Sequence, residues 1–149
     1  MPSLTELASY LESIAPAQIA ESWDNVGVLV RCAQEVTGVL CALDITPATV
    51  REARAVGCNA IVSHHPVIFR PVKELRQGDV PALLVREGVS AVCMHTNLDK
   101  AQGGVNDVLA QALGLRDTEP FAGGIGRVGV LPETMEAAAF AQFVGKALA

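Results

Sequence analysis

The hydrophobic positions of the chain alternate between a helical spacing and short continuous runs. From Leu4 to Leu11 the apolar residues recur every three or four positions, and Ser3 and Glu6 supply a capping box in front of them. This pattern predicts an N-terminal helix. Further helices are predicted where a capping residue or glycine precedes the same spacing, beginning at Thr46-Pro47, Asp79, Gly104 and Thr134.

Short runs of aliphatic and β-branched residues lie between these helical segments and predict strands. They cover residues 27–30, 36–43, 60–62, 89–94 and 127–131. A chain in which strands alternate with helices is typical of a mainly parallel sheet with helices on both faces. We therefore predict an α/β fold that occupies residues 1–149 as a single domain.

The composition narrows the class of protein. Half of the residues are apolar, 18% are charged and 4% are aromatic, which indicates an ordered fold with an aliphatic core. The net charge of −5 and the scattered basic residues argue against a nucleic-acid partner. The N-terminus lacks a basic signal region, and no apolar stretch approaches the roughly 18 residues of a membrane span. A cytoplasmic protein without a membrane partner is expected.

The four cysteines include no C-x-x-C pair. Cys41 and Cys93 lie inside apolar runs, so we interpret the cysteines as small buried hydrophobic residues. The alternative is a peripheral role for Cys93, which stands two residues before His95.

All three histidines follow predicted strands. His64 and His65 come directly after the run at 60–62, and His95 follows the run at 89–94, with Asp99 four residues later. Ligands of open α/β sheets bind outside the carboxyl ends of strands, and a right-handed crossover brings these two ends to the same edge. Imidazole and carboxylate together bind divalent transition metals such as zinc, manganese, iron, cobalt or nickel. A metal site is therefore predicted, and a histidine-rich surface turn is the alternative.

Other polar residues and one glycine motif favour structural interpretations. Asp24 and Asn25, beside the single Trp23, are residues that commonly close turns on their own backbone. Asp44 stands between a predicted strand and a predicted helix, so we favour capping or turn formation over a place on the rim of the site. The segment GIGRVG (124–129) fits the glycine spacing of dinucleotide sites, but it precedes a strand and is interpreted as a flexible turn.

Several segments together resemble the Nif-three-like dinuclear metal proteins, often labelled GTP cyclohydrolase I type 2 homologues. The resemblance spans almost the entire chain in family order, and the pairing of SHHP with HTNLD-x4-GVND is its most specific part. The matching segments are SWDNVGVLV (22–30), ALDITPATVREARAVGCNAIVSHHPVIF (42–69), MHTNLDKAQGGVNDVLAQALGL (94–115) and GIGRVGVL (124–131).

The resemblance implies a role for each of these polar residues. It implies that His64 and His65 each bind one of two divalent metal ions and that Asp99 is another ligand. His95 is implied to line the site, where its imidazole can move a proton as a catalytic residue. Residues 23–25 are implied to form a family signature near the site.

The chain also departs from the family pattern. In the family a later segment supplies a further histidine and a glutamate to the metals, and nothing after Leu131 matches it. We therefore expect the chain to be the N-terminal part of a typical member, with an incomplete metal site. Full-length members resemble ring-shaped hexamers, so a homo-oligomer is expected.

The resemblance implies a metal-dependent hydrolase that acts on a small-molecule nucleotide such as GTP. A phosphoesterase is a related possibility, since dinuclear sites also hold phosphoryl oxygens. The alternative is a non-catalytic metal-binding protein with an interaction or regulatory role. Turnover of GTP or phosphoesters by the metal-loaded protein would distinguish these hypotheses.

Overall fold

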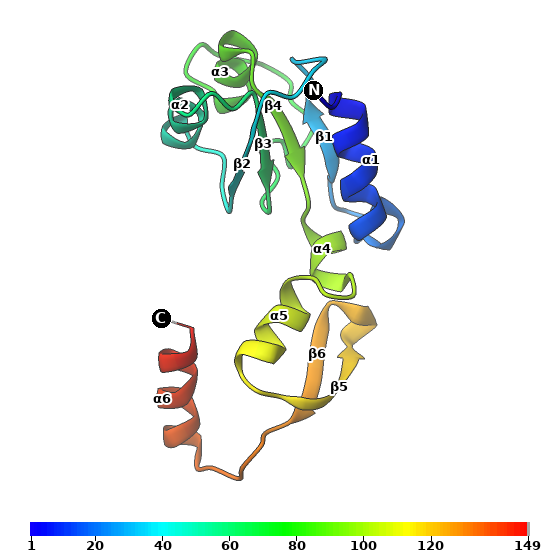
Figure 1. The fold of residues 1–149 in the computed structure, drawn as a ribbon, viewed down its shortest axis with the longest axis vertical. Coiled ribbons are helices and arrows are strands. Elements are labelled where there is room, and N and C mark those ends of the chain that lie inside the picture. The colour runs from blue at the N-terminus through cyan, green and yellow to red at the C-terminus, as the bar shows by residue number, and fades with distance from the viewer. Residues whose placement is uncertain (149) are drawn as a thin grey trace. The chain divides into compact units, whose positions relative to one another are not determined.

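A four-stranded sheet organises residues 1–98 of the computed structural model, which describes residues 1–148 (Figure 1). The order across the sheet is β1-β4-β3-β2. Strands β2, β3 and β4 are parallel, whereas β1 pairs antiparallel with β4. The strands are β1 (Gly27–Val30), β2 (Val39–Ala42), β3 (Ala60–Ser63) and β4 (Ser90–Cys93). The predicted α/β fold with a mainly parallel sheet is confirmed, and its second strand is shorter than the predicted 36–43.

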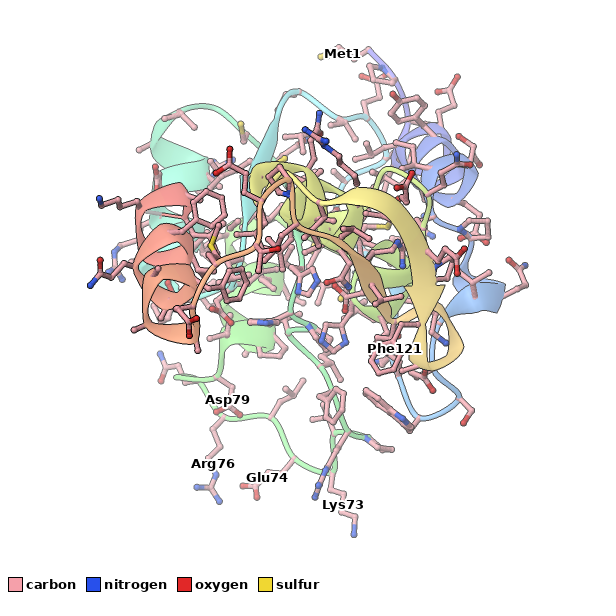
Figure 2. The ribbon with its side chains drawn as sticks, turned by 90° about the horizontal axis from the view of Figure 1, so that it is seen from below. Met1, Lys73, Glu74, Arg76, Asp79 and Phe121 are labelled. Carbon is pink, nitrogen blue, oxygen red and sulfur yellow. The ribbon has the colours of Figure 1, made fainter. Side chains whose placement is uncertain are left out.

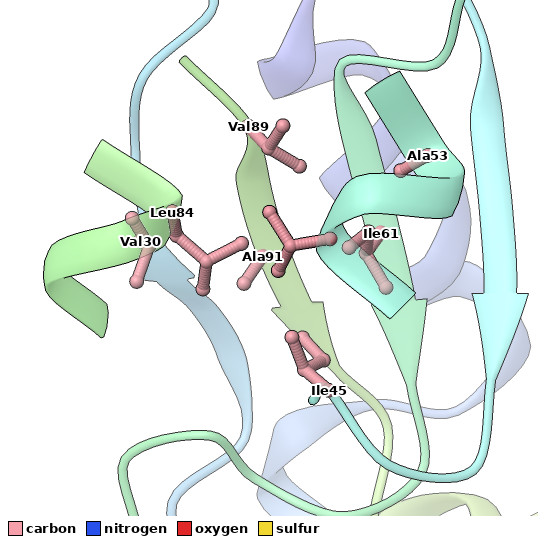
Figure 3. Close-up of a cluster of buried hydrophobic side chains, with 8 residues drawn as sticks. Val30, Ile45, Ala53, Ile61, Leu84, Val89 and Ala91 are labelled. Carbon is pink, nitrogen blue, oxygen red and sulfur yellow. The ribbon is translucent and has the colours of Figure 1, made fainter. Parts of the chain in front are cut away.

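Helices cover both faces of this sheet because the buried strands are apolar on both sides. On one face α2 (Pro47–Ala55) and α3 (Val80–Glu87) pack against Ile61 and Ala91, in the cluster shown in Figure 3. On the other face α1 (Leu4–Ile14) packs through Leu4 against the neighbouring positions Ala60 and Val92. The alternation along β3 and β4 therefore divides the core into two layers.

Helix ends in this part of the chain follow the predicted capping chemistry in most places. The Ser3–Glu6 capping box is present, and Thr46 caps α2 with Pro47 at its first position. Gly88 ends α3 in the left-handed conformation, with φ of 66°. Asp79 precedes α3, but its carboxylate accepts a hydrogen bond from the backbone N–H of Arg76 instead of capping the helix.

An exposed loop connects β3 to α3. Residues 69–78 are all exposed, and Figure 2 shows the side chains of Lys73, Glu74 and Arg76 extending from it. A short 3-10 helix, η1 (Ala17–Ile19), lies in the segment before β1. In the sequence η1 precedes both strands that the histidines follow, whereas the exposed loop lies between these two strands.

Residues 99–149 form a second compact unit that contains a two-stranded antiparallel sheet. Its elements are α5 (Val105–Ala112), β5 (Arg116–Phe121), the 3-10 turn η2 (Ala122–Gly124), β6 (Gly126–Val130) and α6 (Ala137–Ala147). The short helix α4 (Thr96–Lys100) spans the division between the units. Whether the two units act as the predicted single domain stays a prediction.

Arg127 organises the glycine-rich segment of the second unit. Its guanidinium donates to the Asp107 carboxylate, to the Gly124 carbonyl at 2.7 Å and to the Lys100 carbonyl at 3.3 Å. The Arg127 side chain is only 7% exposed, so these acceptors replace the water that the cation loses. GIGRVG therefore forms a turn and a strand, in agreement with the structural interpretation of that motif.

Some elements differ from the predicted ones. β5 and α4 were not predicted, and the last helix begins after Glu136 instead of Thr134. β5 is exposed along its whole length and its first four residues are polar, so it has no alternation for a pattern to detect. In the part of the chain that the structure describes, no helix is both long enough and apolar enough to cross a membrane.

Candidate metal centre

The three imidazoles of His64, His65 and His95 lie together, and we refer to them as the histidine cluster. One ligand nitrogen from each ring lies within 4.8 Å of the others. The ring centroids of His64 are 5.2 Å from those of both His65 and His95, and those of His65 and His95 are 5.8 Å apart. Such spacing allows the three side chains to share a bound ion.

The register of the parallel strands brings these rings together. Ser63, the last residue of β3, pairs with Cys93, the last residue of β4, so both strands end at the same level. The backbone hydrogen bonding between the strands continues one residue past their ends. The His64 N–H donates to the Ala42 carbonyl at 3.2 Å, and the Met94 N–H donates to the Ser63 carbonyl at 2.9 Å. The histidines therefore emerge at one edge of the sheet.

Two side-chain hydrogen bonds hold the turn at the double histidine, one from a neighbouring residue and one from the end of β4. The Ser63 hydroxyl donates to the His65 carbonyl at 2.8 Å, and the Cys93 thiol donates to the His64 carbonyl at 3.1 Å. Burial, followed by the nearby charge of Asp24, raises the pKa of the Cys93 thiol to about 12. Cys93 therefore acts as a neutral hydrogen-bond donor beneath the cluster, which agrees with its interpretation as a buried residue. Cys41 is exposed, so the same interpretation was wrong for that residue.

Asp44 orients the ring of His65. The Nδ1 atom of His65 lies 2.8 Å from Oδ1 of Asp44, which follows strand β2. A carboxylate only accepts, so Nδ1 carries the proton and the lone pair of the neutral ring is on Nε2. The preference for capping or turn formation by the Asp44 side chain was therefore wrong: Thr46 caps α2, and the Asp44 carboxylate holds a histidine.

Asp24 orients the ring of His95 in the same way but in a buried setting. Its Oδ1 lies 2.9 Å from Nδ1 of His95, and its Oδ2 accepts from the Thr96 N–H at 3.0 Å and from the Thr96 hydroxyl. Burial alone would raise the pKa of this carboxyl, but the hydrogen bonds from Thr96, His95 and the Asn25 N–H together lower it. The Asp24 side chain is 0% exposed, and its lowered pKa, which comes from these hydrogen bonds, keeps the buried carboxylate ionised beside His95.

Two exposed aromatic rings lie beside His95. The Trp23 and Phe69 ring centroids are each 6.5 Å from the His95 centroid and 6.0 Å from one another. Asn25 connects their two segments, because its side-chain amide donates to the Ile68 carbonyl at 2.6 Å. Trp23 and Asp24 therefore lie beside the cluster. Asp24 and Asn25 make the structural hydrogen bonds that the sequence favoured, Asp24 also contacts His95, and a functional role of these residues stays a prediction.

The structure brings together His64, His65 and His95 as the strand-end argument predicted. Asp99 lies in α4, but it belongs to the second unit, so its convergence with the histidines stays a prediction. Sequence reasoning placed residues 23–25 near the site by resemblance and weighed Asp44 as a rim residue, but it assigned neither Asp24 nor Asp44 to a particular histidine. Asp44 could have been found as a carboxylate at a strand end beside β3, whereas no local pattern marks Asp24 as a partner of His95.

Comparisons with known proteins identify relatives of this chain. The family model described as Duf34/NIF3 (NGG1p interacting factor 3) matches residues 2–149. A curated protein of Staphylococcus aureus (strain MRSA252), named GTP cyclohydrolase 1 type 2 homolog, is 44% identical over 118 residues, which are 76% of this chain and 32% of that protein. The chain therefore spans about a third of the length of the curated relatives it matches.

Solved structures extend the comparison to the fold. The crystal structure of a Bacillus cereus protein related to NIF3 has a TM-score of 0.74 at 38% identity, over 81% of this chain and 35% of that one. Reduced HcgD from Methanocaldococcus jannaschii has a TM-score of 0.85 at 26% identity, over 97% of this chain and 60% of that one. Together with the family match, these similarities show that the chain belongs to the DUF34/NIF3 family.

Proposed function

We propose that this chain binds divalent metal ions through the histidine cluster and provides the metal-binding part of a metal-dependent hydrolase. The observation that carries the proposal is the convergence of three ring nitrogens within 4.8 Å, with two of the rings oriented by carboxylates. The proposal assigns Asp99 as a further ligand, which is the residue that the family resemblance implies.

The chemistry of the donor set fits a transition-metal ion. Neutral imidazole suits zinc, iron, nickel and related ions, and a ligating histidine usually donates its other ring N–H to a carboxylate or carbonyl. His65 and His95 already donate from Nδ1 to Asp44 and Asp24, so their Nε2 atoms have the correct tautomer to bind a cation. A ring nitrogen binds a cation only when it is unprotonated, because its lone pair is then free.

A divalent ion bound there would lower the pKa of a coordinated water and polarise a substrate oxygen. The residues of this chain would then position the reacting groups. The Asp24 carboxylate stabilises a positive charge on His95, so that ring can accept a proton at Nε2 when it is not a ligand. Both roles of His95, ligand and proton carrier, use the same nitrogen and therefore exclude one another at any moment.

The names of the relatives support a proposal for the substrate class. The curated relatives carry the name GTP cyclohydrolase 1 type 2 homolog, and we propose a small-molecule nucleotide as the substrate of this chain's complete site. A homo-oligomer belongs to the same proposal, because the family resemblance implies a hexamer for full-length members, and light scattering of the purified protein tests it. The family resemblance implies two metal ions in one site, with His64 bound to one ion and His65 bound to the other.

The decisive experiment measures metal content together with folding. Purified wild-type protein and the variants His64→Ala, His65→Ala and Asp99→Asn are loaded with zinc or manganese, desalted and analysed by atomic mass spectrometry. Each substitution should reduce the bound metal, while circular dichroism shows the wild-type secondary structure. Asp79→Asn changes a carboxylate of the β3–α3 connection and should leave the metal content unchanged.

Turnover of GTP by the metal-loaded protein then separates a hydrolase from a non-catalytic metal-binding protein. Loss of metal in His65→Ala with no GTP or phosphoester turnover in the wild-type protein would support the non-catalytic alternative. Unchanged metal stoichiometry in all three variants would refute the assignment of the site.

A further inference from the structure

Two large aromatic side chains are exposed next to the histidine cluster. Trp23 is 57% exposed and Phe69 is 45% exposed, although both are of the type that proteins usually bury at least in part. Their rings meet edge to face at an interplanar angle of 67°, and both contact the ring of His95 in the same manner. We call Trp23 and Phe69 the aromatic pair.

The aromatic pair is held in place by hydrogen bonds on both sides. Asn25 donates to the Ile68 carbonyl, which ties the turn after Trp23 to the residue before Phe69. The Glu21 N–H donates to the Thr96 hydroxyl at 2.9 Å, and the Asp24 N–H donates to the Glu21 carbonyl at 3.0 Å. These hydrogen bonds fix the backbone on both sides of the two rings and therefore keep the rings at the surface.

We propose that the aromatic pair is the binding site for the nucleobase of a nucleotide whose phosphates or reacting ring atoms face the histidine cluster. This inference rests on the proposed function, since it names the part of the chain that recognises the nucleotide. Two rings at 67° offer a planar ligand one face to stack on and one edge to meet, which are the preferred geometries of aromatic contacts. Stacking of this kind accepts any base, because every base has a π face.

The exposed connection that begins at Phe69 carries a positive charge that favours an anionic ligand. Its basic residues are Arg70, Lys73 and Arg76, and its one acid, Glu74, pairs with Arg76 (Lys73, Glu74 and Arg76 are labelled in Figure 2). The carboxylate nearest to Trp23 in the sequence, Asp24, is buried and already accepts hydrogen bonds from His95 and Thr96. The exposed basic residues would repel a cationic ligand, whereas they would attract the phosphates of a nucleotide.

Trp23 allows a direct test because it is the only tryptophan in the chain. Its fluorescence, excited at the red edge of the indole band, is followed while GTP or inorganic tripolyphosphate is added to the metal-loaded protein. GTP should quench the signal in a saturable manner, and tripolyphosphate should not. Phe69→Leu should weaken GTP binding about five- to hundredfold, as expected for the loss of one stacking ring.

The matched variants keep the test interpretable. Phe69→Tyr retains an aromatic ring and should bind GTP as the wild type does, and Phe140→Leu, an equivalent change in α6, should have no effect. Trp23→Leu, measured by calorimetry, should show the same loss as Phe69→Leu. Equal GTP affinity in Phe69→Leu, Trp23→Leu and the wild type, or tripolyphosphate binding as tight as that of GTP, would overturn the inference.

Metal analysis of the same samples separates this inference from the proposed function. If GTP quenches Trp23 and Phe69→Leu weakens it while no metal is retained, the aromatic pair is supported and the metal centre is wrong. If metal binds normally and the Phe69 and Trp23 variants bind GTP like the wild type, the aromatic pair is wrong and the metal centre stands.

Discussion

Replacing Asp24 with asparagine should weaken metal binding and destabilise the fold at the same time. The Asp24 side chain is 0% exposed, and its two oxygens accept hydrogen bonds from His95, from Asn25 and from the backbone and hydroxyl of Thr96. An asparagine has nearly the same shape, but it presents an NH₂ group where one oxygen stood. The substitution therefore changes the hydrogen bonding with little change in packing.

The two orientations of the new amide have different costs. If its NH₂ faces Thr96, the Thr96 backbone N–H loses its acceptor in a buried position. If it faces His95, the ring must accept at Nδ1 and carry its proton on Nε2, which removes the lone pair that a metal needs. One lost charge-assisted hydrogen bond with a buried unpaired group amounts to about 2–4 kcal/mol of unfolding free energy. Loss of the supporting carboxylate should lower metal affinity about 10- to 100-fold.

The pH dependence of stability provides an independent signature. Folding lowers the pKa of Asp24, so its stabilisation is fully present above the pKa of the unfolded chain and is lost as the pH falls through the folded value. In the metal-free protein, the difference in unfolding free energy between wild type and Asp24→Asn should therefore be largest near neutral pH. That difference should shrink as the pH is lowered into the range where carboxylates protonate.

Urea denaturation at several pH values and metal titration by calorimetry measure both effects. Asp44→Asn is the matched control, because Asp44 makes the equivalent contact to His65 but is 58% exposed. It should weaken metal binding with less than about 1 kcal/mol of destabilisation, since water replaces the lost partner. A variant Asp24→Asn with wild-type stability and wild-type metal affinity would refute the role assigned to this carboxylate.

Three further predictions concern the fold. Leu84→Ala should lower the free energy of unfolding by about 2–5 kcal/mol, because Leu84 is fully buried between α3 and the sheet. Val85→Ala, at an exposed position of the same helix, should lower it little, and urea denaturation of the two variants measures the difference. Gly88→Ala should destabilise by about 1–2 kcal/mol because φ is 66°, and a wild-type denaturation midpoint would contradict this. In Ellman's assay at pH 8, Cys41 should react and Cys93, with its pKa of about 12, should stay unmodified until urea unfolds the protein.

Local signals in the sequence located most of the regular elements. Ser3 with Glu6, and Thr46 with Pro47, satisfy the first N–H groups of their helices from residues a few positions away. The strand at 27–30 was predicted with its observed bounds. Such features are readable because both partners of the interaction lie within one turn or one short run of the chain.

β5 shows where local signals end. Its residues, Arg116–Phe121, are all exposed and include a proline, so neither hydrophobicity nor strand propensity marks them. The strand exists because β6 pairs with it, from Arg116 opposite Val130 to Phe121 opposite Gly126. Backbone pairing with a partner strand decided this element, and a window of sequence contains no information about that partner.

The candidate site also combines features that the sequence determines locally with features that depend on the tertiary structure. The sequence by itself determined that His64, His65 and His95 follow buried strands, and parallel strands place such residues at one sheet edge. Only the tertiary structure decided which carboxylates hold the rings, because Asp44 lies 21 residues from His65 and Asp24 lies 71 residues from His95. Hydrophobic periodicity reports which face of an element is buried, whereas hydrogen-bond partners at this separation depend on strand register and on the path of the connecting loops.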